Sequence, residues 1–293
     1  MPTTTSDTDS FLPPPSALIL PEKPLVTIEP KGWWVGVNLR DLWSYRELLY
    51  FLTWRDIKIR YKQTLLGGAW AILQPVFMML IFTIFFGRLG GVKTGEIPYA
   101  LFAFAGLVPW TFFANSVTVS GNSLVGSANL ITKVYFPRLL LPAAAVTAGL
   151  VDFMLAFIVL VGLLLFYRVT PTWNLLMLPP LIALTVLFAL SVGMWLSALN
   201  VKYRDVRFAL PFMIQVWLFI SSVIVPSTGV PERFRWLLLL NPMSAIIEGF
   251  RSTLLGLRFD WTALWIAAVI TLFALVGSAY SFKRMEKHFA DII

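Results

Sequence analysis

The chain has 293 residues, of which 58% are hydrophobic and only 13% are charged, and its mean hydropathy is +0.78. Soluble domains carry about 25% charged residues, so this composition excludes a soluble protein and indicates one that is embedded in a membrane. The absence of cysteine from the sequence excludes disulfides, thiolate metal sites and cysteine nucleophiles. We attribute the net charge of +8 to membrane topology and anionic lipid headgroups, and we expect no nucleic-acid binding.

The N-terminal 66 residues divide into two predicted parts. Residues 1–32 hold seven of the 19 prolines and lack helical periodicity, so we predict an extended or disordered arm. In residues 40–62, by contrast, charged residues recur at helical spacing, while Leu42, Tyr45, Leu49 and Leu52 mark another face. We therefore predict a cytoplasmic amphipathic helix within residues 33–66. It would lie in the headgroup plane or, alternatively, pack on a partner protein.

Six later segments are long and apolar enough to cross a bilayer, which takes about 20 mostly apolar residues in a helix. We predict an all-α membrane protein with spans at about residues 67–88, 97–119, 139–167, 174–199, 208–227 and 261–282. Together these form a six-span domain over residues 67–282, followed by a tail over residues 283–293. No period of 20 to 50 residues repeats along the chain.

Positive charge predicts the orientation of these spans. The segments on the side of both termini hold 16 of the 23 Lys and Arg residues, and the opposite segments hold 7. Because Lys and Arg are enriched in cytoplasmic loops, we expect both termini in the cytoplasm. A polar, helix-capable stretch over residues 121–137 would then form a short cytoplasmic helix between spans two and three.

The segment between spans five and six is apolar but interrupted. Residues 236–247 are twelve uncharged residues, too few to cross the hydrocarbon as a helix, and Asn241 and Pro242 lie in their middle. We predict a pair of re-entrant half-helices that are broken at this dipeptide.

Polar residues that could carry chemistry are few. Asp152 is the only acid within a predicted span, which suggests either a functional carboxylate or a hydrogen-bonded structural residue. The sequence contains no G-x-x-x-x-G-K-[ST] motif, and its one histidine, His288, has no second histidine or cysteine nearby. We therefore predict no ATP hydrolysis by this chain, no metal site and no catalytic residue.

Three sequence strings resemble those of one family. They are residues 55–67 (RDIKIRYKQTLLG) running into 69–75 (AWAILQP), residues 198–206 (ALNVKYRDV), and residues 240–244 (LNPMS) with Glu248, Gly249, Phe250 and Arg251. In this order they resemble the entry to the first span, the cytoplasmic turn before span five and the external re-entrant element of ABC-2 type polysaccharide export permeases. The likeness covers about residues 40–290.

The resemblance implies the membrane subunit of an ABC transporter in the bacterial inner membrane. Such subunits export undecaprenyl-diphosphate-linked polysaccharide such as O-antigen, act with a second copy of themselves and two ATP-binding cassette subunits, and leave ATP and Mg to those partners. Exporters of teichoic acid, capsule or a small lipid or drug remain alternatives. A membrane glycosyltransferase or polymerase also remains an alternative, although such an enzyme should have clustered acidic residues to bind a metal and a sugar nucleotide, and the acidic residues here are scattered. An ion-coupled carrier is a further alternative, for which Asp152 is the only support.

The resemblance also assigns roles on the cytoplasmic side. The polar helix between spans two and three would be the coupling helix that docks into the ATPase. Alternatively, it is a solvated loop whose Lys and Arg residues only reflect the enrichment of cations in cytoplasmic loops. The residues expected to couple are Asn129, Leu130, Lys133, Tyr135 and Arg138, with Lys202, Tyr203, Arg204 and Asp205 as a second contact. The cations expected at the lipid diphosphate, or alternatively at ordinary headgroups, are Arg55, Lys58, Arg60 and Lys62.

Two further sets complete the expected site. Aromatic rings suit a sugar conduit, although many aromatics in spans only face lipid or pack between helices. The candidates for lining the conduit are Phe77, Phe82, Phe85, Trp110, Phe113 and Trp217. The half-helices at Asn241 and Pro242 would close the external mouth, with Glu248 and Arg251 paired nearby either as part of this gate or as a satisfied ion pair without a gating role.

Overall fold

The computed structural model describes residues 43–62, 68–92, 94–286 and 289. All of them belong to one of the chain's two units, Gly36–Ile293. The predicted arm over residues 1–32 lies outside the described residues, as do residues 33–42 and 63–66 of the predicted helix over 33–66 and most of the tail beyond Glu286. Every regular element in the described part is a helix, as the sequence predicts.

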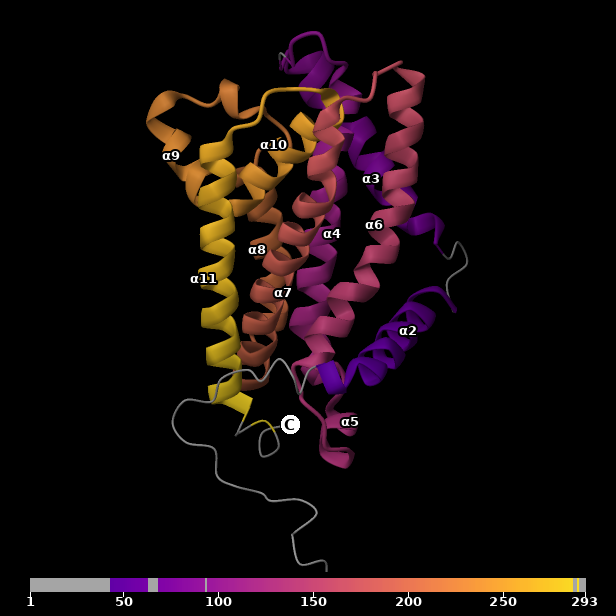
Figure 1. Cartoon of the computed structure of the whole chain (residues 1–293), viewed down its shortest axis with the longest axis vertical. Coiled ribbons are helices and arrows are strands. Elements are labelled where there is room, and N and C mark those ends of the chain that lie inside the picture. The colour runs from indigo at the N-terminus through magenta and orange to yellow at the C-terminus, as the bar shows by residue number, and fades with distance from the viewer. Residues whose placement is uncertain (1–42, 63–67, 93, 287–288, 290–293) are drawn as a thin grey trace, which may run out of the picture. The chain divides into compact units, whose positions relative to one another are not determined.

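Ten α-helices carry this part of the chain (Figure 1). They are α2 (Arg46–Lys62), α3 (Ala69–Phe82), α4 (Tyr99–Gly126), α5 (Ala128–Lys133), α6 (Leu140–Phe166), α7 (Leu178–Lys202), α8 (Val206–Ile220), α9 (Glu232–Leu240), α10 (Pro242–Leu255) and α11 (Trp261–Glu286). A π-helical segment, Thr83–Leu89, continues α3, and a 3-10 turn, Trp173–Met177, precedes α7. Two boundaries differ from the prediction. The second span, predicted to end at about residue 119, extends to Gly126, and the short helix predicted within residues 121–137 is limited to α5.

Five of these helical stretches are long and apolar enough to cross a membrane: Ala69–Leu89, Tyr99–Gly126, Leu140–Phe166, Trp173–Lys202 and Trp261–Glu286. They correspond to five of the six predicted spans. The segment predicted as the fifth span instead contains α8, which has 15 residues and ends at Ile220. Its last residue is followed by Ser221 in an extended conformation, so the chain leaves the helix before residue 227.

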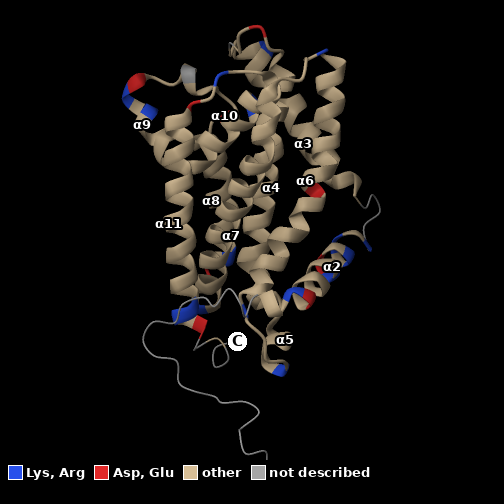
Figure 2. Ribbon diagram, viewed as in Figure 1, with Lys and Arg blue, Asp and Glu red and all other residues tan. Residues whose placement is uncertain are grey.

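Most charged residues lie at the two opposite ends of the long helices (Figure 2). One end carries α5, the start of α2 and the end of α11, and we call it the α5 end (Figure 1). The opposite end carries α9 and α10, and we call it the α10 end. The helices between the two ends are nearly free of charge, apart from α2, which is rich in cations and lies inclined against α6 (Figure 2).

Helix α4 forms the centre of the described part. In its most apolar 18-residue window, 83% of the residues are buried inside the protein, against 17–28% in the other four long helices. Glycines let its neighbours approach closely. A Cβ atom added to Gly149 of α6 would lie 2.6 Å from Ser116 Oγ, and one added to Gly193 of α7 would lie 2.4 Å from Ser120 Oγ. Such small-residue contacts are typical of helix packing in membranes.

Candidate functional site

Asn241 organises the junction between α9 and α10. Its side-chain oxygen accepts hydrogen bonds from the Met243 N–H (3.2 Å) and from Trp217 Nε1 (3.0 Å), and its amide donates to Ser221 Oγ (3.0 Å). Pro242 takes the first position of α10, where a helix has no use for a backbone N–H. The helix break predicted at Asn241 and Pro242 is therefore present, and it fixes the start of α10 to the end of α8. The re-entrant placement of the two helices stays a prediction.

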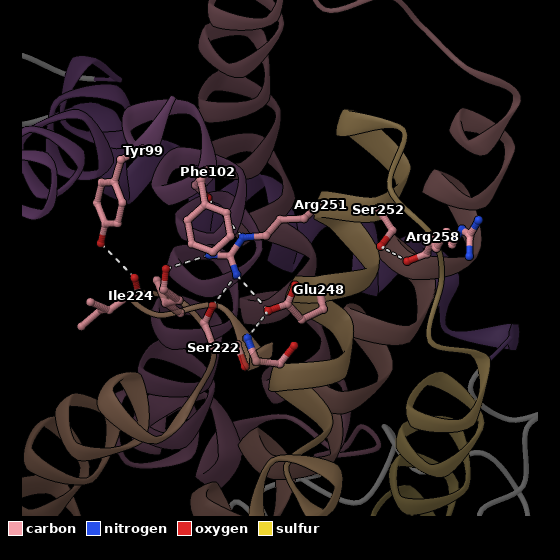
Figure 3. A network of polar contacts seen from close by, with 10 residues as sticks. Tyr99, Phe102, Ser222, Ile224, Glu248, Arg251, Ser252 and Arg258 are labelled. Atoms are coloured by element: carbon pink, nitrogen blue, oxygen red, sulfur yellow. Dashed lines mark hydrogen bonds and ion pairs between the residues drawn. The ribbon is translucent and has the colours of Figure 1, made fainter. Parts of the chain in front are cut away.

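Arg251 of α10 is fully buried and donates hydrogen bonds to backbone carbonyls of two other segments (Figure 3). It donates to Phe102 O of α4 (3.1 Å), to Ser222 O and to Val223 O (2.7 Å), and its guanidinium lies 3.5 Å from the centroid of the Phe102 ring. Ser222 and Val223 follow α8, where helical hydrogen bonding has ended. A buried carbonyl without a partner is costly, so Arg251 supplies the donors that the broken helix lacks.

Two more side chains hold the same loop. Tyr99 of α4 donates its hydroxyl to Ile224 O (2.9 Å), and Glu248 accepts from the Ser227 N–H (3.1 Å) (Figure 3). The predicted pair of Glu248 and Arg251 exists at 3.3 Å, but it is only one of several contacts of Arg251. No pattern in the sequence indicates Tyr99, Phe102 or the loop carbonyls as partners. The one hint is the pair of charged residues, Glu248 and Arg251, in an otherwise apolar segment.

Gly106 makes room for Arg251, and its replacement gives a first prediction. In Gly106→Ala, the new Cβ would lie 2.5 Å from Arg251 Nη2, whose hydrogen bonds leave it no other place to go. We expect the free energy of unfolding to fall by about 1–3 kcal/mol, as for other overpacked cores, even though alanine favours a helix. Chemical unfolding of the purified protein measures this change. As the control, Gly162→Ala on α6 meets no atom within 4 Å and should be neutral or slightly stabilising; an equal loss in both variants would contradict the packing argument.

Asp152 of α6 has its partners on α2. Its carboxylate forms an ion pair with Arg60 and accepts a hydrogen bond from the Tyr61 hydroxyl. Burial and this hydrogen bond raise the pKa of Tyr61. A second contact joins Thr53 Oγ1 and Thr147 Oγ1 at 2.9 Å. Asp152 is thus ion-paired and hydrogen-bonded to α2, and the inner face of α2 packs on α6 of its own chain.

This packing divides the four cations predicted for a lipid diphosphate. Arg60 is engaged by Asp152 and turned toward α6. The other three line an open groove of about 420 Å³ on the outer face of α2, together with Phe51, Trp54 and Ile59. Within the groove, Arg55 pairs with Asp56 at 2.8 Å, and Lys58 lies 5.3 Å from the Trp54 ring, while Lys62 is exposed.

The residues predicted to couple to an ATPase lie at the α5 end (Figure 1). Tyr135 is 96% exposed, Asn129 and Lys133 are exposed, and Leu130 is half-buried. Arg138 differs: its Nη1 donates to Glu286 O of α11 (2.7 Å), and its own N–H contacts Glu286 Oε1. The turn between α7 and α8 presents a second exposed set, Lys202, Tyr203, Arg204 and Asp205.

Five of the six predicted conduit aromatics fall into an exposed and a buried group, and the sixth, Trp217, is half-buried. Phe77 and Phe85 are exposed on the α3 side, at 54% and 59%. Phe82, Trp110 and Phe113 are buried, and Phe113 packs between Phe188 and Trp217 with ring centroids 5.2 and 5.1 Å away. In the single chain, the buried rings serve packing rather than an open surface. Within the described residues, no three His, Cys, Asp or Glu side chains are placed to hold a metal ion.

Five apolar helices that are long enough to cross a membrane, one of which is the buried α4, define a multi-pass α-helical membrane protein. The chain belongs to the ABC-2 type transporter family, whose sequence profile matches residues 47–255. It is 30% identical over 258 residues to the O-antigen export system permease protein RfbA of Myxococcus xanthus, covering 87% of this chain and 98% of that protein. It is also similar to RfbA of Klebsiella pneumoniae (29% identical; 84% and 95% covered) and to the polysialic acid transport protein KpsM of Escherichia coli (24%; 79% and 91%).

Proposed function

We propose that this chain is the permease subunit of an ABC transporter that exports a lipid-linked polysaccharide, of the O-antigen type, outward across a bacterial inner membrane. The observation that carries this proposal is the similarity to O-antigen export permeases over nearly their whole length. The cargo would be linked to undecaprenyl diphosphate. The groove formed by Arg55, Lys58 and Lys62 supports this, because cations beside apolar rings suit a diphosphate on an apolar chain.

The proposal includes six spans with both termini in the cytoplasm. The six would be the five long helices and α8, which at about 1.5 Å per residue rises about 22 Å and falls short of the hydrocarbon thickness. Residues 221–227 would cover the remaining depth without helical hydrogen bonds, which a membrane tolerates only where protein groups satisfy the backbone. Arg251, Tyr99 and Glu248 satisfy it here. In this arrangement, α9 and α10 form the re-entrant element on the external side.

The α5 end would then face the cytoplasm and receive two ATP-binding cassette subunits, which bind ATP and Mg, with a second copy of this chain completing the conduit. The exposed side chains of Asn129, Lys133 and Tyr135 support this docking surface. Arg138 would act indirectly, because it fastens the start of α6 to the end of α11. Phe77 on α3 and Phe85 in the π-helical segment that continues it are the aromatics whose exposure suits a conduit wall between two copies.

A charge-reversed docking surface tests the function. In Lys133→Glu/Tyr135→Ala, we expect at least a tenfold loss of the co-purifying ATPase activity and of surface polysaccharide, because both side chains project from the chain without supporting its fold. The measurements are ATP hydrolysis by the eluate of a pull-down from native membranes, and surface glycan on the producing cells.

The matched control is Arg233→Glu, an exposed charge on α9 at the opposite end, which should leave both readouts unchanged. Arg138→Glu should instead lower the stability of the permease itself. If the unaltered chain elutes without any nucleotide-hydrolysing partner, the ABC export function is wrong. Sugar incorporation from nucleotide-sugar donors would then favour the glycosyltransferase alternative.

A further inference from the structure

A cationic pocket of about 360 Å³ lies at the α5 end, among the last turns of α4 and α7, the start of α5 and the start of α8. Its volume is in the range of small-molecule sites, about 300–1,000 Å³. Arg204 and Arg207 line it, and no acidic residue does. The rest of the wall is Asn200 and small or apolar residues, among them Val125 and Phe208.

The two arginines have no anion of their own. Both side chains are exposed, and neither guanidinium forms an ion pair or a hydrogen bond with a described residue. Asp205 lies between them in the sequence but pairs with neither, and Arg207 has only the Phe208 ring as a neighbour, 5.2 Å away. A guanidinium presents several N–H donors in the geometry that phosphate oxygens accept. The pocket therefore suits a phosphate group.

An apolar groove farther along α8 shows what this phosphate would be attached to. The groove has a volume of about 450 Å³, and α8 lines it with side chains that include Phe212, Val216 and Ile220. Phe208 of the pocket and Phe212 of the groove are 72% and 70% exposed, and their spacing of four residues places them on one face of the helix. An exposed apolar surface thus leads from the arginines into the groove.

The length of this path fits a fatty acyl chain. At about 1.5 Å per residue, Phe212 lies about 8 Å and Ile220 about 20 Å beyond Arg207 along α8. One leaflet of the hydrocarbon is about 15 Å deep, so the acyl chains of a phospholipid whose phosphate lies at Arg207 would end within the groove. An undecaprenyl chain is several times longer than the groove. The cargo therefore fits this site less well than an ordinary membrane lipid.

We propose that the pocket of Arg204 and Arg207, together with the groove along α8, binds an anionic phospholipid such as phosphatidylglycerol. The phosphate lies between the two guanidinium groups, and the acyl chains follow Phe208 and Phe212. A zwitterionic phospholipid fits less well, because its ammonium group would lie beside two arginines in a pocket that no carboxylate lines. Arg204 is thereby assigned to a lipid rather than to the predicted contact with an ATPase.

Two lipids that differ in headgroup charge test the inference. The delipidated full-length chain in detergent is titrated with dioleoyl phosphatidylglycerol or dioleoyl phosphatidylethanolamine, and bound lipid is counted by native mass spectrometry. We expect at least tenfold tighter binding of the phosphatidylglycerol. Arg204→Gln/Arg207→Gln should reduce this preference below threefold. Lys133→Gln/Lys202→Gln is the matched control, because it removes two exposed charges from the same end outside the pocket, and it should keep the tenfold preference.

A fluorescent probe tests the path of the acyl chains. The chain contains no cysteine, so Phe212→Cys provides a single site for a bimane label. Phosphatidylglycerol with brominated acyl chains should quench this label at least threefold more strongly than brominated phosphatidylethanolamine at the same concentration. Adding Arg204→Gln/Arg207→Gln should reduce the quenching to the level of the ethanolamine lipid.

Equal affinity for the two lipids would overturn the inference, and so would a preference that survives in the arginine double variant. A preference without quenching of the label on α8 would overturn it as well, because a second copy of the chain, rather than acyl chains, would then cover the groove. The assays contain neither an ATPase nor a glycan. Their failure would therefore leave the proposed export function standing, and failure of the export function would not affect this lipid site.

Discussion

Arg251→Met is expected to lower the free energy of unfolding by about 3–5 kcal/mol, the loss that follows when one member of a buried charge pair is removed. The substitution keeps much of the side-chain volume but leaves three carbonyls, of Phe102, Ser222 and Val223, without their donor. The loop between α8 and α9 should then detach from α4. Unfolding in mixed micelles, followed by tryptophan fluorescence, measures the stability, and protease cleavage within residues 221–231 reports the detached loop.

Two variants make this result specific. Arg251→Lys keeps the charge but brings a single nitrogen to acceptors that the guanidinium reaches with three, so we expect an intermediate loss. Arg258→Met changes an exposed arginine beyond the same helix and should cost less than about 0.5 kcal/mol. If Arg251→Met proves as stable as Arg258→Met, the guanidinium does not hold the loop.

The second large effect is expected at the pair of Arg60 and Asp152, which joins α2 to the middle of α6. Arg60→Met leaves the carboxylate of Asp152 without its partner, and Asp152→Leu does the same to the guanidinium of Arg60. Each variant should lower the free energy of unfolding by about 3 kcal/mol. In the double variant both charges are gone, so its loss should not exceed that of either single variant. A double-mutant cycle on the free energy of unfolding measures the coupling, which we expect at about 3 kcal/mol.

The neutral contact between the same two helices is the control for this cycle. Thr53→Val and Thr147→Val remove a hydroxyl pair, and coupling between such groups in membrane proteins averages about 0.6 kcal/mol. Additive losses at Arg60 and Asp152 would mean that the two charges act independently and that other contacts hold α2 against α6.

The sequence predicted the helices well because a bilayer imposes a simple rule of length and apolarity. Five spans appear within a few residues of their predicted positions, except that α4 runs on to Gly126. The segment after Ile220 could not be predicted, because residues 221–226 are uncharged and read as a continuing span. The carbonyls of Ser222 and Val223, in the loop that follows the helix, find their donors on Arg251, a partner that hydropathy does not report.

The candidate site shows the same limit at the level of single residues. Arg60 and Asp152 were each singled out, but their pairing depends on how α2 crosses α6, which no local pattern encodes. Arg138 lies among exposed cations in the sequence and yet is fastened to Glu286, which is 148 residues away. The ion pair of Glu248 and Arg251 could be predicted from the sequence, because a spacing of three residues places both side chains on one helix face.

The burial of α4 has a consequence for how the protein is made. This helix emerges from the ribosome before α6, α7 and α10, which supply most of its contacts. Ser116 and Ser120 of α4 therefore contact lipid first, and only later Gly149 of α6 and Gly193 of α7. Arg251, which joins α4 to the loop after α8, is synthesised about 150 residues later than Phe102. Native packing of the core therefore waits for nearly the whole chain. A truncation before residue 251 should leave inserted but unassembled helices, which are substrates for membrane quality control.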